Sequence, residues 1–125
     1  MLKGIFVIHN SGICLYNKYN SDIFPNEQLF SGFLTALSRF CVNIIGEKIS
    51  RFCTNTLKFN FIYEHELFFV FIVHKNDILE DFKPQFRQIM KEFYKEFTNQ
   101  RTVFEKHGLI PQLTNFETSL SSICS

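Results

Sequence analysis

The stretch Leu67-Phe68-Phe69-Val70-Phe71-Ile72-Val73 decides the fold, because it is apolar at both odd and even positions. Successive side chains of a strand point to opposite faces, so this pattern predicts a central strand covered on both sides. Phe69 and Phe71 should then lie on one face, and Phe68, Val70 and Ile72 on the other. A second run of the same kind, Ile5-Phe6-Val7-Ile8, lies near the amino terminus. We therefore expect these two strands to be neighbours in the middle of one sheet.

Further strands are predicted around these two. Gly4 to His9 is expected to form the first strand, and Ile13 to Asn17 to return as its hairpin partner after a turn that contains Gly12. Two more strands are expected before the central one, at Ile49 to Thr54 and Leu57 to Tyr63, and the central strand should extend from Leu67 to His74.

A first long helix is predicted over Leu29 to Ile45, where apolar residues recur three and four positions apart. Asn26 is suited to cap its amino end, and Gly46 to end it in a left-handed conformation. The apolar arc of this helix, about 160° wide at 100° per residue, is expected to face the sheet. The polar remainder of the helix should then face outward.

A second long helix is predicted to begin at Asp77, because Asp77-x-x-Glu80 resembles a capping box. Pro84 removes the hydrogen bond to the carbonyl group of Glu80, so we expect a kink or a restart of the helix there. A short terminal helix is predicted at about residues 114–123, where Phe116 and Leu120 lie four positions apart.

Length and composition indicate one globular domain over residues 1–125, with its core in residues 3–99. A chain of 125 residues can bury a core without disulfides, and the content of 46% hydrophobic and 20% charged residues argues against disorder. The 17 phenylalanines supply the bulk of that core. A formal net charge of +1 gives no long-range field for nucleic acid or an anionic membrane, so neither is expected as a partner.

Cysteine usage and apolar runs indicate the compartment. The four cysteines (Cys14, Cys41, Cys53 and Cys124) form no Cys-x-x-Cys pair, which favours free thiols in a reducing environment. The amino terminus has no signal-peptide pattern, and the longest apolar run is too short to span a membrane. We expect a soluble cytoplasmic protein without an integral membrane segment.

No stretch of the chain predicts a reaction. His9 and His74 end the two central strands and are the best metal or acid–base candidates, but antiparallel neighbours would place them at opposite ends of the sheet. His65 is expected to be a solvated turn residue. No nucleophile elbow or glycine-rich phosphate loop is present. We therefore predict no catalytic residue, no cofactor and no metal site, and a protein that is not an enzyme.

The order of strand, strand, helix, three strands, long helix and short helix resembles that of the longin domains, and more distantly the roadblock domains. The resemblance covers nearly the whole chain and rests on the Gly4 to Ile13 hairpin, the Leu29 to Ile45 helix and the Phe68 to Val73 strand. It implies an α+β, profilin-like fold. The implied five-stranded antiparallel sheet has the order 2-1-5-4-3, with the first helix on one face and the later helices on the other.

The resemblance also implies a function. No helix is predicted before the first strand, which favours the longin over the roadblock type, and the chain looks like a stand-alone longin rather than a SNARE. Longin and roadblock domains are non-enzymatic modules of vesicle-trafficking machinery and of regulators of Ras-like GTPases. We expect a homo- or heterodimer with another longin- or roadblock-like chain, a Ras-like small GTPase as a further partner, and membrane association only through partners. A profilin-like ligand-sensing or enzymatic domain is the alternative.

The outward residues of the first helix indicate where a partner binds. They are mostly small and uncharged, whereas those of the second long helix are mostly Lys, Arg and Glu. Interface centres are depleted in Lys and Glu and retain Arg, so we predict a protein interface there; a merely exposed helix is the alternative. The resemblance implies that the neighbouring edge strand joins it. The predicted interface residues are Ser31, Thr35, Arg39, Val42, Asn43, Ser50 and Phe52.

Overall fold

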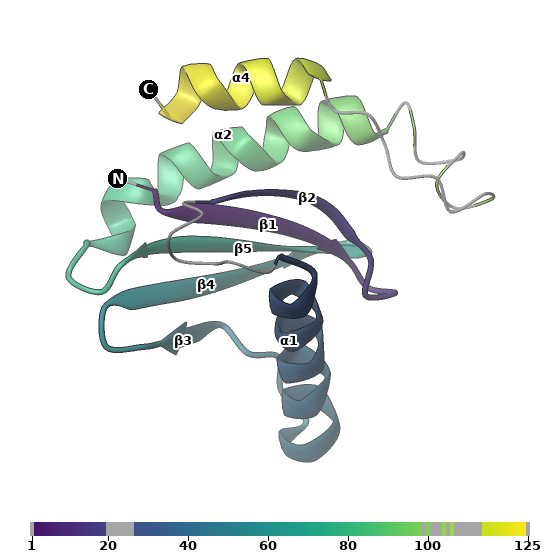
Figure 1. The fold of residues 1–125 in the computed structure, drawn as a ribbon, viewed down its shortest axis with the longest axis vertical. Helices are drawn as coiled ribbons and strands as arrows, with labels where there is room; N and C mark the ends of the chain where they lie inside the picture. Colours follow the sequence, from purple (N-terminus) through teal and green to yellow (C-terminus); the bar gives the residue numbers. More distant parts are fainter. Residues whose placement is uncertain are drawn as a thin grey trace. The chain divides into compact units, whose positions relative to one another are not determined.

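A five-stranded sheet is the framework of this computed structural model (Figure 1), which describes residues 2–19, 27–98, 100, 104, 106 and 114–124. The chain divides into two compact units, Met1–Asp77 and Ile78–Ser125. The first unit contains the sheet and helix α1, and the second contains the helices α2 and α4.

The sheet has the order β2-β1-β5-β4-β3, and every neighbouring pair of strands is antiparallel. This arrangement confirms the predicted sheet order. The strand bounds are β1 Gly4–His9, β2 Cys14–Tyr19, β3 Arg51–Cys53, β4 Leu57–Glu64 and β5 Leu67–His74. β2 begins and ends later than predicted, and β3 is shorter than the predicted Ile49 to Thr54 strand.

The central position of β5 is confirmed by its pairing and its burial. It pairs with β1 from Gly4↔Ile72 to His9↔Leu67, and with β4 on its other side. Every residue of β5 is buried except the last, His74, which is half-buried. One face contributes Phe68, Val70 and Ile72 to the same apolar cluster as Leu34 of the helix. On the opposite face the rings of Phe69 and Phe71 stack with centroids 6.1 Å apart.

Helix α1, Glu27–Phe40, packs on the Phe68 side of the sheet and continues as a π-helical turn, η1, over Cys41–Ile45. The ring of Phe30 lies 5.1 Å from that of Phe6 and 5.7 Å from that of Phe59. Gly46 ends the helix with φ of 81°, and its N–H donates to the carbonyl groups of Cys41 and Val42. The predicted end at Gly46 is therefore confirmed. The predicted cap, Asn26, lies outside the described residues.

The second unit contains α2, Leu79–Phe97, and α4, Thr114–Cys124. The ring of Phe93 meets that of Phe116 edge-on at 5.2 Å, and Gln85 Nε2 donates to the carbonyl oxygen of Ile123 at 3.2 Å. Helix α2 is continuous through Pro84, so the predicted restart is wrong. The carbonyl that loses its bond belongs to Glu80, an exposed residue in the first turns, where water can replace the missing N–H.

The predicted capping box at Asp77 is also wrong. Helix α2 begins at Leu79, and the residue before it makes no side-chain cap. The carboxylate of Asp77 instead accepts the backbone N–H of His74 at 3.0 Å, while its own N–H donates to the His74 carbonyl group at 3.0 Å. Asp77 therefore closes the turn that follows β5.

His9 and His74 lie at opposite ends of the sheet, as the antiparallel register requires, because His9 pairs with Leu67. Each Nδ1 accepts a backbone N–H two residues further on, from Ser11 and Asn76, both at 3.1 Å. The two imidazoles therefore hold turns and form no common site. In the described ranges, no three His, Cys, Asp or Glu residues gather as a metal-binding set.

Within the part of the chain that the structure describes, no helix combines the length and the apolar composition needed to cross a bilayer.

Replacing a buried ring of β5 should test the central-strand assignment. Phe71→Ala removes a fully buried side chain and should lower the free energy of unfolding by about 3–5 kcal/mol, a large part of a typical domain's stability. Ile78→Ala is the control, because that side chain is 63% exposed and its loss should cost about 0.5 kcal/mol or less. Equal urea midpoints for Phe71→Ala and the wild type would contradict the assignment.

Candidate interaction site

The side of α1 that faces the sheet carries small hydroxyl residues beside the predicted apolar residues Phe30, Leu34 and Leu37, so the predicted orientation of this helix is only partly correct. Ser31, Thr35 and Ser38 are 4%, 8% and 9% exposed, and lie on the same side of the helix as Leu34, which is fully buried. Ser31 and Thr35 were predicted to lie on an outer interface. They are buried within their own domain, so they are not part of the outward surface of the helix.

Hydrogen bonding explains how hydroxyl residues occupy the buried side. Thr35 Oγ1 donates to the carbonyl oxygen of Ser31 one turn earlier, at 3.0 Å, and Ser38 Oγ lies 3.2 Å from the phenol oxygen of Tyr63. Small side chains that satisfy their polar atoms in this way let a helix approach a sheet closely. Ser31 Oγ is buried without a hydrogen-bond partner among the described residues. Apolar periodicity alone cannot detect such a face, since it counts hydroxyl residues as solvent-facing.

The opposite side of α1 exposes large apolar side chains. Leu29 is 73% exposed, Phe33 46% and Phe40 57%. At about 100° per residue these positions form one stripe, opposite the buried Ser31, Leu34 and Ser38. The stripe continues into η1. We call the exposed set the outer apolar face; its members are Leu29, Phe33, Phe40, Ile44 and Ile45. Val42 is also exposed, but it lies on the opposite side of the helix, in line with Ser38.

The end of this helix projects beyond the sheet, as Figure 1 shows for the carboxyl-terminal part of α1 and the turn after it. Every residue from Arg39 to Lys48 is exposed except the half-buried Cys41. Four large apolar residues (Phe40, Val42, Ile44 and Ile45) therefore lie in a helical segment with little protein around it. A contiguous apolar surface of this kind is typical of an interaction site.

Strand β3 adjoins the outer apolar face at the edge of the sheet. The ring of Phe52 lies 6.0 Å from that of Phe33 and 5.0 Å from that of Phe59, so it links the helix surface to the sheet. Ser50 is exposed, and its carbonyl oxygen accepts the N–H of Phe61 at 3.0 Å. The predicted residues Ser50 and Phe52 thus lie beside this apolar surface. Their role in an interface stays a prediction.

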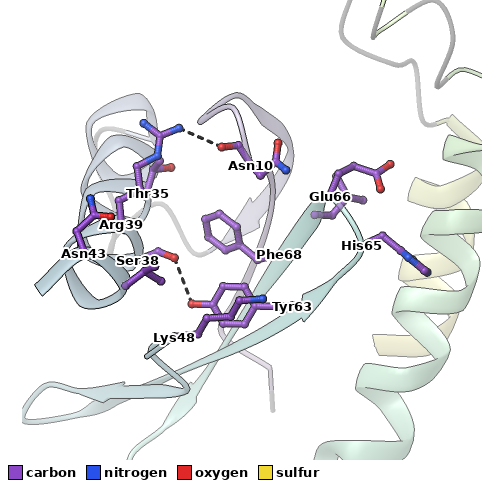
Figure 2. Close-up of a pocket in the computed structure, with 12 residues that line it drawn as sticks. Asn10, Thr35, Ser38, Arg39, Asn43, Lys48, Tyr63, His65, Glu66 and Phe68 are labelled. Carbon is purple, nitrogen blue, oxygen red and sulfur yellow. Dashed lines mark hydrogen bonds between the residues drawn. The ribbon is translucent and has the colours of Figure 1, made fainter. Parts of the chain in front are cut away.

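A hollow of about 310 Å³ lies between α1 and the β4–β5 hairpin (Figure 2). Four of the predicted interface residues line it: Thr35, Arg39, Val42 and Asn43. The structure therefore brings this part of the prediction together around one cavity. The other lining residues are Asn10, Ser38, Lys48, Tyr63, His65, Glu66, Leu67 and Phe68.

Two hydrogen bonds fix α1 on either side of the hollow, and both are drawn in Figure 2. Arg39 Nη2 donates to the carbonyl oxygen of Asn10 at 3.0 Å, which ties the helix to the β1–β2 turn. The contact between Ser38 and Tyr63 ties it to β4. The ring of Phe68 lies 5.7 Å from that of Tyr63 and forms the apolar floor between these contacts.

Among the described groups that line this hollow, Tyr63 has a clearly shifted pKa. Burial raises the pKa of the phenol above its ordinary value of about 10, the hydrogen bond with Ser38 lowers this pKa, and the nearby Cys41 raises it. The ammonium group of Lys48 lies 4.9 Å from the centre of the Tyr63 ring, in a cation–π contact.

Sequence reasoning did not identify Lys48, Tyr63 or Phe68 as site residues. Tyr63 and Phe68 were predicted only as strand residues, and Lys48 lies between two predicted elements. The register explains why they meet: Tyr63 pairs with Phe68 across the β4–β5 hairpin, and Lys48 reaches the Tyr63 ring. The signal available in the sequence was the short hairpin turn, which requires Tyr63 and Phe68 to be cross-strand neighbours.

The sheet order, together with a helix packed on one face, defines an α+β fold of the roadblock and longin kind. Among solved structures, the chain is similar to MglB of Myxococcus xanthus, with a TM-score of 0.61 and 12% sequence identity over 78% of this chain and 78% of that chain. At this identity the similarity shows a shared fold. No protein-family model matches the chain, and no curated protein matches it in sequence.

The pKa of Tyr63 should respond to its hydrogen bond with Ser38. That bond lowers the pKa, so Ser38→Ala should raise the pKa further above its ordinary value. The measurement is a pH titration of the ¹³Cζ chemical shift of Tyr63. An unchanged or lower pKa in Ser38→Ala would contradict the hydrogen bond described above.

The same shift should make stability depend on pH in the alkaline range. Because the pKa is raised in the folded state, the stabilisation is fully present below pH 10 and is lost as the pH rises from 10 through the folded-state pKa. Tyr63→Phe should lose less stability over this alkaline interval than the wild type. Urea unfolding at neutral and alkaline pH measures the difference, and parallel losses in the two proteins would contradict the prediction.

Proposed function

We propose that this chain is a non-enzymatic interaction module that pairs with a second chain of the same fold through the outer apolar face and strand β3. The observation that carries the proposal is the exposure of large apolar side chains on α1 and η1, including Leu29, Phe40 and Ile44. Exposed apolar surface on this scale is stabilised when a partner removes it from water.

The edge position of β3 supports a partner of the same fold. A strand at the edge of a sheet presents unpaired backbone groups on its outer side, and another edge strand can pair with them. β3 lies at one end of the strand order, next to the outer apolar face through Phe33 and Phe52. A second copy can therefore extend the sheet while its helix covers the exposed apolar residues.

We further propose that the pair is a subunit of a complex that regulates a Ras-like small GTPase or serves vesicle trafficking. The support is the resemblance of the element order to longin and roadblock domains, together with the fold similarity to MglB. In this proposal the protein acts in the cytoplasm and reaches membranes only through its partners.

The hollow beside Phe68 favours a second candidate, a ligand-sensing domain of profilin-like fold. Its volume of about 310 Å³ lies at the lower end of the range for small-molecule sites. A ligand that binds only the folded state raises the melting temperature of the protein. The ligand-sensing domain should therefore be stabilised by a small molecule, and the interaction module by a protein partner.

Introducing charge on the outer apolar face should separate a pair into folded monomers. Phe40→Glu and Ile44→Glu each place a carboxylate on an exposed apolar position, so the monomer should keep its fold while burial against a partner becomes unfavourable. Light scattering after size-exclusion chromatography measures the mass, and circular dichroism checks the fold. Ile78→Glu is the control, because Ile78 is equally apolar and 63% exposed but lies outside this surface. A monomeric wild type, or pairs that persist in both variants, would contradict self-pairing through this face.

A thermal-shift screen should distinguish the module from the ligand-sensing domain. As an interaction module, the protein should show no change in melting temperature with nucleotides or divalent metals added alone. A rise of about several degrees with one of these additions, in the absence of a protein partner, would favour the second candidate.

A further inference from the structure

The hollow between α1 and the β4–β5 hairpin has an apolar floor whose nearby hydroxyl groups already have partners. Phe68 and Leu67 are 5% and 2% exposed, so they form a buried apolar base. Thr35 Oγ1 bonds to the helix backbone, and Ser38 bonds to Tyr63. The apolar part of a bound group would therefore meet the Phe68 and Tyr63 rings, and few hydroxyls remain to select it.

Two cations stand at the rim of this hollow. Arg39 and Lys48 lie on opposite sides of the Phe68 ring in Figure 2. Arg39 uses one N–H for the Asn10 carbonyl group, and Lys48 contacts the Tyr63 ring. Among the described residues, neither cation forms an ion pair with a carboxylate. The remaining N–H groups of both side chains therefore have capacity for an acidic group.

Glu66, the acidic residue that lines the hollow, does not occupy the space between Arg39 and Lys48. Figure 2 shows the side chains of Glu66 and His65 turned away from the Phe68 ring. The region between Arg39 and Lys48 thus combines positive charge with an aromatic base. Such an arrangement recognises a carboxylate carried on a small apolar body, because charge-assisted hydrogen bonds and ring contacts can form together.

We propose that this hollow binds an acidic side chain of a protein partner, with the carboxylate between Arg39 and Lys48 and the adjoining apolar atoms on Phe68 and Tyr63. A protein source is favoured over a free acid by continuity, because Val42, which lines the hollow, lies in the same exposed apolar segment of η1 as Ile44 and Ile45. The inference rests on the proposed function in so far as the ligand belongs to a protein. It adds a specific pocket and the chemistry that the pocket selects.

A pair of blocked dipeptides tests this site directly. Acetyl-Leu-Glu-amide and acetyl-Leu-Gln-amide differ in one charged group, and each is titrated into the ¹⁵N-labelled full chain while amide chemical shifts are recorded. The glutamate peptide should shift the signals of Arg39, Lys48 and residues 63–68, and should bind about tenfold more tightly than the glutamine peptide, because it replaces a neutral acceptor by a charged one. Shifts elsewhere, or equal affinity for the two peptides, would overturn the proposal.

Variants separate the role of charge from that of shape. Lys48→Gln removes one cation, and binding of the glutamate peptide should weaken about tenfold. Lys91→Gln is the matched control, because Lys91 is an exposed cation on another element and its loss should leave the affinity unchanged. Unchanged affinity in Lys48→Gln would overturn the proposal. Tighter binding of free phenylacetate than of the glutamate peptide would overturn the protein source and assign the hollow to small acids.

This titration is independent of the test of pairing. It is performed on the wild type and repeated on Ile44→Glu, whose altered side chain does not line the hollow. Peptide binding by a monomeric wild type would reject the pairing and retain the acid-binding pocket. A pair that Ile44→Glu disrupts, without peptide binding by either protein, would reject the pocket and retain the pairing.

Discussion

The pairing of β1 with β5 is the interaction on which the rest of the structure depends. Both strands are buried on both faces over most of their length, and six consecutive residue pairs, from Gly4↔Ile72 to His9↔Leu67, fix their register. A slip of one residue would move every side chain to the opposite face. That register sets the face to which Phe6 and Phe68 contribute, and therefore the surface on which α1 packs.

The way α1 packs produces both candidate sites. Because hydroxyl residues occupy its buried side, the large apolar residues Phe33 and Phe40 face outward in place of a charged surface. The same orientation brings Thr35, Ser38 and Arg39 to the rim of the β4–β5 hairpin, where the hollow lies. An orientation with the broad apolar arc on the sheet would remove the outer apolar face. The rotation of α1 about its own axis therefore determines both the exposed apolar surface and the hollow.

The sequence was sufficient to predict the sheet but not the rotation of the helix. Strands with continuous apolar runs leave little ambiguity, so β1 and β5 were predictable as central neighbours, and the full strand order was implied by the resemblance to longin domains. The helix has apolar residues around more than one side, and apolar periodicity does not show which side the sheet covers. The outcome depends on hydroxyl groups that satisfy themselves, as Thr35 does with the Ser31 carbonyl group. The start of α2 was missed for a similar reason, since the carboxylate of Asp77 bonds to His74 instead.

The position of the predicted interface residues differs from the prediction, and their role in an interface stays a prediction. Small, uncharged residues on α1 were interpreted as the centre of a contact between proteins, whereas Ser31 and Thr35 make contact within the domain itself. Close packing of a helix against a sheet and close packing between two proteins select the same residue types, so composition alone cannot separate them. Exposure distinguishes the two kinds of surface, because a contact within the domain buries its residues, whereas Leu29 and Ile44 are exposed, as our proposal of a protein interface requires.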